Sequence, residues 1–185
     1  MSLLTPTTSE VVNQAFVEHC CLAYQMDHEG YHGFDLWMRV LHNGRLLVEG
    51  EHANLKVVEL FCLLHDTQRR NEHVDPQHGQ RAAQFAETLR GDWFELTDDE
   101  MDLLTEALTY HSDGYTVGDI TVKACWDADR LDLGRVGIRP APERLCTDTA
   151  RSPFVLEEAY QRSIKRNSNG PVSYTHLTLP TILLV

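Results

Sequence analysis

The chain lacks the usual features of a membrane or secreted protein. Its 185 residues contain neither a run of about eighteen apolar residues, which a membrane span needs, nor a basic, apolar leader. Its five cysteines are odd in number and lack CxxC spacing, which argues against a disulfide framework and a structural zinc site. We therefore expect a cytoplasmic protein with no membrane partner, in which most cysteines are small core residues.

Basic residues are also scarce. Lys and Arg total 16 against 28 Asp and Glu, which gives a formal net charge of -12. Because such a surface repels polyanions, we expect no nucleic-acid polymer as a partner. A small-molecule phosphate substrate is compatible with this charge, since a metal ion and a few local Arg or Lys side chains can hold one phosphate.

Strand-like alternation of apolar and polar residues is nearly absent, which predicts an all-α fold. The length and the 42% hydrophobic content suit one compact multi-helix bundle with a substantial core. Helix start and stop signals indicate successive helices. They run from a cap at Ser9 to about 26, from 30–31 to about 48, from a cap at Asn54 onward, from Pro76 to about 89, from a Thr97 to Glu100 capping box to about 110, from about 120 to 133, and from about 153 to 165.

The end of the chain resembles a translated DNA adaptor. Residues 172–181 are the peptide obtained by translating GTC TCT TAT ACA CAT CTG ACG CTG CCG ACG, which resembles a transposase-based sequencing adaptor read as coding DNA. The alternative is a genuine apolar C-terminal strand. We expect residues 1–171 to form the helical domain and residues 172–185 to be a non-native tail, which we exclude from functional argument.

Two polar residues end an otherwise apolar segment. His65 and Asp66 directly follow residues 57–64, which are suited to a protein core. Because an unpaired buried carboxylate is unfavourable, such a pair needs a partner, and one cation can compensate the imidazole and the carboxylate together. A divalent metal is the simplest candidate, and a hydrogen-bonded core pair is the alternative.

Two other segments add ligand types. His32 lies near the start of an amphipathic helix, and Asp129 lies among carboxylates that interrupt a partly apolar helix. The order is His, His-Asp, Asp, with separations of 33 residues (32 to 65) and 63 residues (66 to 129). This order, ending in the string 128–132 (ADRLD), resembles the HD-domain metal-dependent phosphohydrolase superfamily over about residues 10–140. The wider string 127–138 is similar to a bacterial subgroup whose substrates are mostly unassigned.

The resemblance implies a metal site and its chemistry. It places the ion on His32, His65, Asp66 and Asp129, while Asp127 and Asp132 would lie on the helix surface or just behind the ligands. Imidazole and carboxylate donors suit Mn, Fe, Co, Ni or Zn. The ion would polarise a phosphoryl oxygen and activate a water that Asp66 helps to position. One ion is sufficient and is favoured, and two are an alternative.

Further residues are candidates for catalysis and for substrate binding. His78 and His111 lie where some members of the superfamily have extra histidines, so they are candidates for a second ion, a general acid or a phosphate contact. The alternative is that both are surface histidines at helix ends. Arg69 follows the His-Asp pair by about one turn and Lys123 precedes Asp129 by six residues, so both are candidate phosphate contacts.

Three functions therefore compete. The leading prediction is a hydrolase of phosphomonoesters or phosphodiesters that acts on a nucleotide or a related small phosphate. A di-iron HD-type oxygenase is the second, and it requires both His78 and His111 as ligands. A non-catalytic HD-like binding module is the third, although such proteins commonly lose part of a ligand set that is complete here. The sequence predicts no particular oligomeric state.

Overall fold

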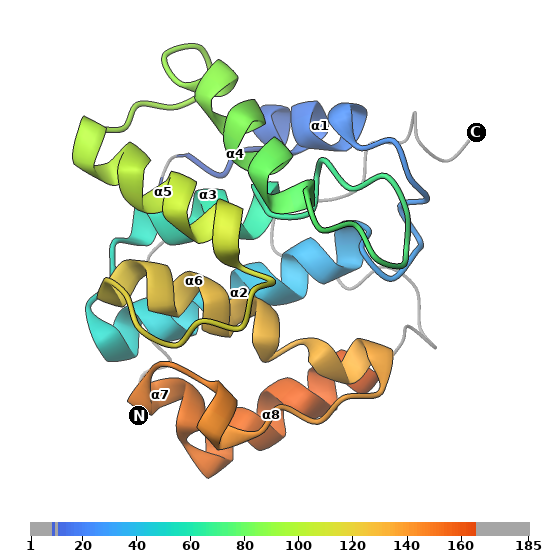
Figure 1. The fold of residues 1–185 in the computed structure, drawn as a ribbon, viewed down its shortest axis with the longest axis vertical. Helices are drawn as coiled ribbons and strands as arrows, with labels where there is room; N and C mark the ends of the chain where they lie inside the picture. The colour runs from blue at the N-terminus through green and yellow to red at the C-terminus, as the bar shows by residue number, and fades with distance from the viewer. Residues whose placement is uncertain (1–8, 10, 166–185) are drawn as a thin grey trace.

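The structure, a computed structural model, describes residue 9 and residues 11–165 (Figure 1). Within this range the chain is helical, and its only strand-like feature is an isolated bridge between Arg90 and Phe94. The predicted all-α fold is confirmed. The helices are α1 (Gln14–Ala23), α2 (Phe34–Glu51), α3 (Leu55–Leu64), α4 (His78–Leu89), α5 (Asp98–Tyr110), α6 (Ile120–Arg130), α7 (Asp148–Arg151) and α8 (Pro153–Ile164), with short 3-10 helices η1 (Leu133–Val136) and η2 (Pro142–Arg144).

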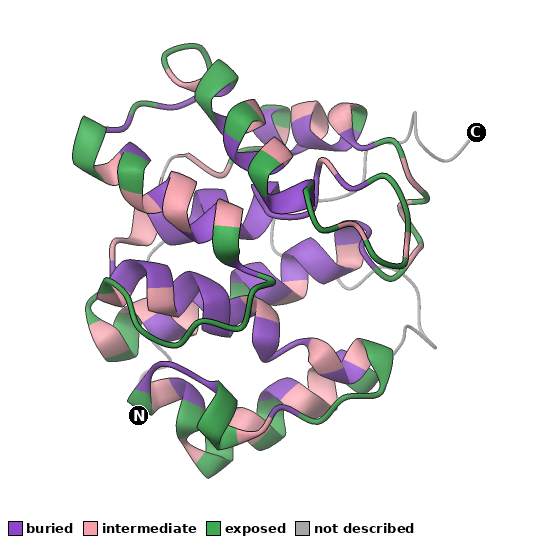
Figure 2. Cartoon of the chain, viewed as in Figure 1, coloured by how far each residue is buried: buried purple, intermediate pink, exposed green. Residues whose placement is uncertain are grey.

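The centre of the bundle is α3. It packs against α2, α5 and α6, and every residue from Val57 to Leu64 is buried (Figure 2). A helix that is apolar on nearly all sides is stable only when other helices surround it. The burial of α3 therefore carries His65 and Asp66, which follow its last residue, into the interior.

Two predicted helix starts are confirmed by their caps. The Asn54 side chain accepts a hydrogen bond from the Val57 N–H at the start of α3. The Thr97 hydroxyl and the Glu100 carboxylate form the reciprocal capping box of α5. These signals involve only neighbouring residues, so the sequence alone is enough to identify them.

Three other starts were predicted too early. The first helix begins after Asn13, whose side chain accepts from the Phe16 N–H, whereas the Ser9 N–H donates to the buried Glu59 carboxylate on α3. The second begins at Phe34, and the fourth begins two residues after Pro76. A tertiary contact thus replaces the expected Ser9 cap.

The prediction that most cysteines are small core residues is confirmed. All five cysteines are buried free thiols. In the described part of the chain no helix combines the length and apolarity that crossing a bilayer requires.

Residues 172–185 lie outside the described residues, and their assignment as a non-native tail stays a prediction. Deleting them should leave activity and melting temperature essentially unchanged, because a peptide encoded by adaptor DNA was never selected to pack on this domain. Differential scanning calorimetry of both chains measures this. A decrease of more than about 4 °C, the scale of roughly 1 kcal/mol in a domain of this size, would show that the tail belongs to the fold.

Candidate metal centre

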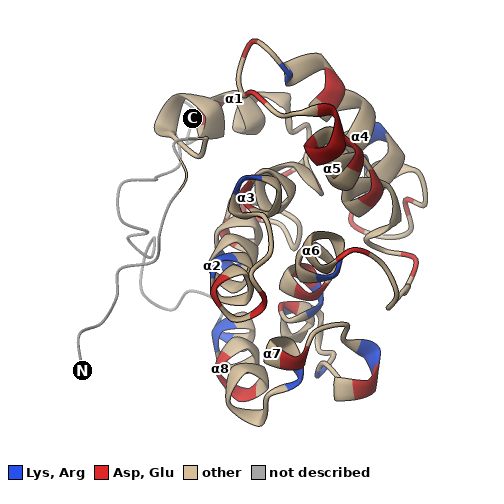
Figure 3. Ribbon diagram, turned by 90° about the vertical axis from the view of Figure 1, so that its left-hand side faces the viewer, with Lys and Arg blue, Asp and Glu red and all other residues tan. Residues whose placement is uncertain are grey.

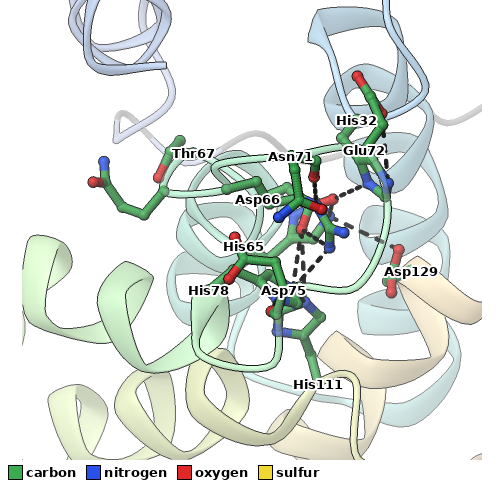
Figure 4. Close-up of polar contacts among 12 residues, drawn as sticks. His32, His65, Asp66, Thr67, Asn71, Glu72, Asp75, His78, His111 and Asp129 are labelled. Atoms are coloured by element: carbon green, nitrogen blue, oxygen red, sulfur yellow. Dashed lines mark hydrogen bonds and ion pairs between the residues drawn. The ribbon is translucent and has the colours of Figure 1, made fainter. Parts of the chain in front are cut away.

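Six predicted site residues meet where several helices end (Figure 4). His65 and Asp66 follow α3, Asp129 lies in the last turn of α6, and His32 lies in the turn before α2. The other two are His78, the first residue of α4, and His111, which follows the last residue of α5. The carbonyl ends of α3, α5 and α6 favour a cation here, whereas the N-terminal ends of α2 and α4 at the same place oppose it.

Asp66 is the centre of the cluster. Its Oδ2 lies 2.8 Å from His32 Nδ1 and 3.6 Å from His65 Nε2. Its Oδ1 lies 3.3 Å from His78 Nε2 and 3.8 Å from His111 Nε2. Each carboxylate oxygen thus faces its own pair of histidines. Both His78 and His111 are buried next to Asp66, so the interpretation of them as surface residues is wrong.

Three of these histidine rings are held in a ligand-like orientation. In each ring Nδ1 contacts the backbone carbonyl three residues earlier. The pairs are His65 with Cys62 at 3.1 Å, His78 with Asp75 at 2.5 Å, and His111 with Leu108 at 2.8 Å. A ring that donates through Nδ1–H presents the lone pair of Nε2, and metal-binding histidines are usually fixed in this way.

Several buried polar atoms in the cluster lack a hydrogen-bond partner among the described residues. They are His65 Nε2, Asp66 Oδ1 and Asp129 Oδ1. His65 Nε2 is 3.8 Å from Asp129 Oδ1, too far for a hydrogen bond. Native proteins rarely leave buried polar atoms unpaired. One nitrogen and two carboxylate oxygens without partners are donor types that suit a divalent transition metal.

The charges of the cluster also suit a cation. Burial alone would raise the pKa of Asp66, but His65, His111, His32 and His78 together hold it well below its usual value. Burial opposes ionisation of Asp129 as well, and there the Arg135 charge holds the pKa below its usual value. Burial lowers the pKa of His65. The site therefore offers two carboxylates and a neutral imidazole.

A second group of ligand atoms lies beside the first. Asp66, His78 and His111 each present an atom within 4.8 Å of the others, and the two Nε2 atoms are 2.8 Å apart. Two nitrogens bound to one ion at about 2.1 Å would be separated by about 3.0 Å at a right angle and about 3.4 Å at the tetrahedral angle. However, Arg69 Nη1 is 3.2 Å from His78 Nε2 and 3.6 Å from Asp66 Oδ1. This fixed positive charge disfavours an additional ion at that position.

His32 has a different environment from the other histidines. Its Nδ1 contacts Asp66, and its Nε2 lies 3.7 Å from Glu72 Oε2. His32 thus lies between Asp66 and Glu72, and its role as a metal ligand stays a prediction. Sequence reasoning missed Glu72, which lies in the polar loop between α3 and α4, where no periodic pattern marks it.

A cavity of about 420 Å³ opens onto the cluster. Arg69 lines it, as predicted, but Lys123 does not. Lys123 precedes Asp129 by six residues, which is about 9 Å along α6. It therefore lies away from the cluster, near Glu51 at the last residue of α2. The other lining residues are His32, Asp66, His78, His111, Ser112, Gly114, Asp129, Arg130, Leu133, Arg135 and Arg144. Sequence reasoning missed Arg135 and Arg144, which lie on the short helices η1 and η2.

The fold, but not the sequence, has a match among known proteins. No protein-family model matches the chain, and no curated protein matches it. The crystal structure of a predicted HD superfamily hydrolase from an uncultured Thermotogales bacterium is similar to it, with a TM-score of 0.62 and 24% sequence identity over 81% of this chain and 86% of that chain. The chain therefore shares the fold of that protein, which agrees with the resemblance that the order of its motifs indicates.

Proposed function

We propose that this protein is an HD-type metal-dependent phosphohydrolase that acts on a small phosphorylated metabolite, a nucleotide or a related phosphoester. The observation that carries the proposal is a buried cluster of ligand atoms beside a cavity. Asp66, His78 and His111 present atoms within 4.8 Å of one another, and His65 Nε2, Asp66 Oδ1 and Asp129 Oδ1 have no hydrogen-bond partner among the described residues. The similar fold of a predicted hydrolase supports it.

The residues of the cluster have complementary roles in this proposal. A divalent ion (Mn, Fe, Co, Ni or Zn) held by His32, His65, Asp66 and Asp129 would polarise a phosphoryl oxygen and acidify a water. Arg69, whose Nη1 lies 3.6 Å from Asp66 Oδ1, would bind phosphoryl oxygens through its planar fork of donors. His78 or His111 would deliver a proton to the leaving oxygen.

A substrate screen tests the proposal. The protein is stripped with a chelator, reloaded with each candidate ion, and incubated with a chromogenic phosphate ester, nucleotides and sugar phosphates while released phosphate is measured. We expect release only after a divalent ion is restored. Stoichiometric metal binding with no release from any substrate would instead indicate a binding module.

A di-iron oxygenase is the second candidate, and the geometry of Asp66 favours it. Because its two oxygens face two different histidine pairs, the carboxylate is placed to bridge two ions. The charge of Arg69 beside His78 argues against it. Two iron ions per chain together with oxygen consumption would support the oxygenase, and one ion together with phosphate release would exclude it.

The two basic residues predicted to bind phosphate should differ in effect. Arg69→Gln should lower kcat/KM by about tenfold or more, since a hydrogen bond to a charged group contributes about 1.5–3 kcal/mol. Lys123→Gln should leave kcat/KM within about twofold, because Lys123 does not line the cavity. Steady-state kinetics on the best substrate of the screen measures both. Equal losses in the two variants would contradict the placement of Lys123.

A further inference from the structure

The charge of the cavity is opposite to that of the chain. Acidic residues outnumber basic ones by 28 to 16 overall, and they are prominent on α5 (Figure 3). The cavity lining has the reverse balance, with two carboxylates and four arginines, namely Asp66, Asp129, Arg69, Arg130, Arg135 and Arg144. A divalent ion would balance the two carboxylates and leave the arginine charge for anions.

Arg135 is a buried cation with unused donors. Its side chain is 9% exposed, and its Nε and Nη1 have no hydrogen-bond partner among the described residues. The two nearest carboxylates, Asp129 and Asp132, lie 3.6 Å and 3.7 Å away, beyond hydrogen-bond distance. Asp132 instead accepts two hydrogen bonds from Arg39, at 2.7 Å and 3.0 Å. Because unsatisfied buried donors are unfavourable, those of Arg135 point to an absent anionic ligand.

Arg144 lines the same cavity from η2. It is exposed, and its guanidinium makes no hydrogen bond or ion pair with the described residues. Its backbone carbonyl accepts a hydrogen bond of 3.2 Å from Arg130, whose Nη2 donates to the Tyr115 carbonyl at 2.6 Å. Arg130 is thus a positioning residue that ties Arg144 to the loop between α5 and α6, while Arg144 keeps its donors free.

We propose that Arg135 and Arg144 form a subsite for a second anionic group of the substrate, distinct from the phosphoryl group beside Arg69. Arg69 lies 3.6 Å from Asp66 and Arg135 lies 3.6 Å from Asp129, so the two carboxylates have separate cationic neighbours. The cavity volume of about 420 Å³ lies within the usual range for small-molecule ligands. The substrate class is a phosphoester that also bears a phosphate or a carboxylate, and this inference rests on the proposed function.

Binding of substrate-like anions tests the subsite independently of turnover. The full chain is titrated by calorimetry with methylphosphonate, phosphonoacetate and methylenediphosphonate, with Mn²⁺ at equal concentration in cell and syringe. Phosphonoacetate and methylenediphosphonate each carry two anionic groups, whereas methylphosphonate carries one. We expect one of the two to bind at least about tenfold more tightly than methylphosphonate. The probe that does so identifies the second group as a carboxylate or a phosphate.

Matched variants separate the subsite from general charge effects. Arg144→Gln should weaken binding of the preferred probe by about tenfold and change that of methylphosphonate by less than about twofold. Arg135→Gln should act similarly, and the exposed Arg144 keeps the test valid if that variant folds poorly. Arg70→Gln is the control, because Arg70 is exposed and does not line the cavity.

Each contrary result has a defined meaning. Equal losses on all three probes would show that the arginines contribute only general positive charge and would overturn the subsite. Equal affinities for the three probes in the unmodified protein would overturn the subsite and leave the proposed function intact. If methylphosphonate does not bind at all, the phosphoryl site itself is absent, and the proposed function fails together with the subsite.

Discussion

Asp66→Ala should remove bound metal and activity together. Asp66 is buried, contacts four histidines and supplies an anionic oxygen to each side of the cluster. Mutation of residues that only hydrogen-bond to metal ligands lowers metal affinity or activity by about 10–100-fold. Because Asp66 is itself a proposed ligand, we expect its loss to lower kcat/KM by at least about a hundredfold. His65→Ala should behave alike. Elemental analysis after dialysis, together with phosphate release in added Mn²⁺, measures both effects.

The effect of Asp66→Ala on folding should be smaller than its effect on activity, because the remaining donors face a cavity that water can enter. Thermal denaturation of the metal-free proteins tests this. Asp92→Ala removes an exposed carboxylate and should change neither metal content nor activity. Stoichiometric metal in Asp66→Ala would exclude Asp66 as a ligand.

Asp127→Ala should have the largest effect on stability. Asp127 is fully buried, and burial raises its pKa. Its carboxylate accepts hydrogen bonds from the Cys146 N–H, the Thr147 N–H and the Thr147 hydroxyl, and so it attaches α6 to the segment before α7. Alanine would leave three buried donors unpaired, at about 1–3 kcal/mol each. We expect a loss of roughly 3 kcal/mol or more in the free energy of unfolding, and hence a decrease in melting temperature of about 6–12 °C.

Chemical denaturation by urea measures the loss in Asp127→Ala directly. The exposed Asp113 provides the matched control, since Asp113→Ala removes a carboxylate from a surface loop and should change stability by less than about 0.5 kcal/mol. A loss below about 1 kcal/mol in Asp127→Ala would mean that water or a rearranged backbone satisfies these donors.

The parts of the molecule that the sequence predicts are those determined by local chemistry. Asn54 and Thr97 mark helix starts through side chains that bond the adjacent backbone. His65 and Asp66 are identifiable because two polar residues end a segment that must be buried. The order of His32, His65, Asp66 and Asp129 along the chain in turn indicates which fold contains these local features.

The errors have tertiary causes. Asp127 is not on the helix surface, because residues 145–147, which are distant in sequence, cover its face of α6. Asp132 is also buried, where it pairs with Arg39 of α2. This excludes the helix surface for Asp132 and leaves the other expected position, just behind the ligands. Arg135 and Arg144 reach the cavity from short 3-10 helices, which produce no periodic pattern. Their role depends on how the chain after α6 folds back, and that information is absent from spacing alone.

The most direct test of the metal centre is an anomalous-scattering map from crystals of the full chain grown with Mn²⁺. The proposed metal centre predicts an anomalous peak beside Asp66, either toward His65 and Asp129 or between Asp66, His78 and His111, with ligand distances of about 2.0–2.3 Å. The number of peaks also gives the ion count. The contrary result is a map in which Mn²⁺ is bound at surface carboxylates, such as those in the first turn of α5, while the cluster shows no peak. That result would contradict a metal centre at this site.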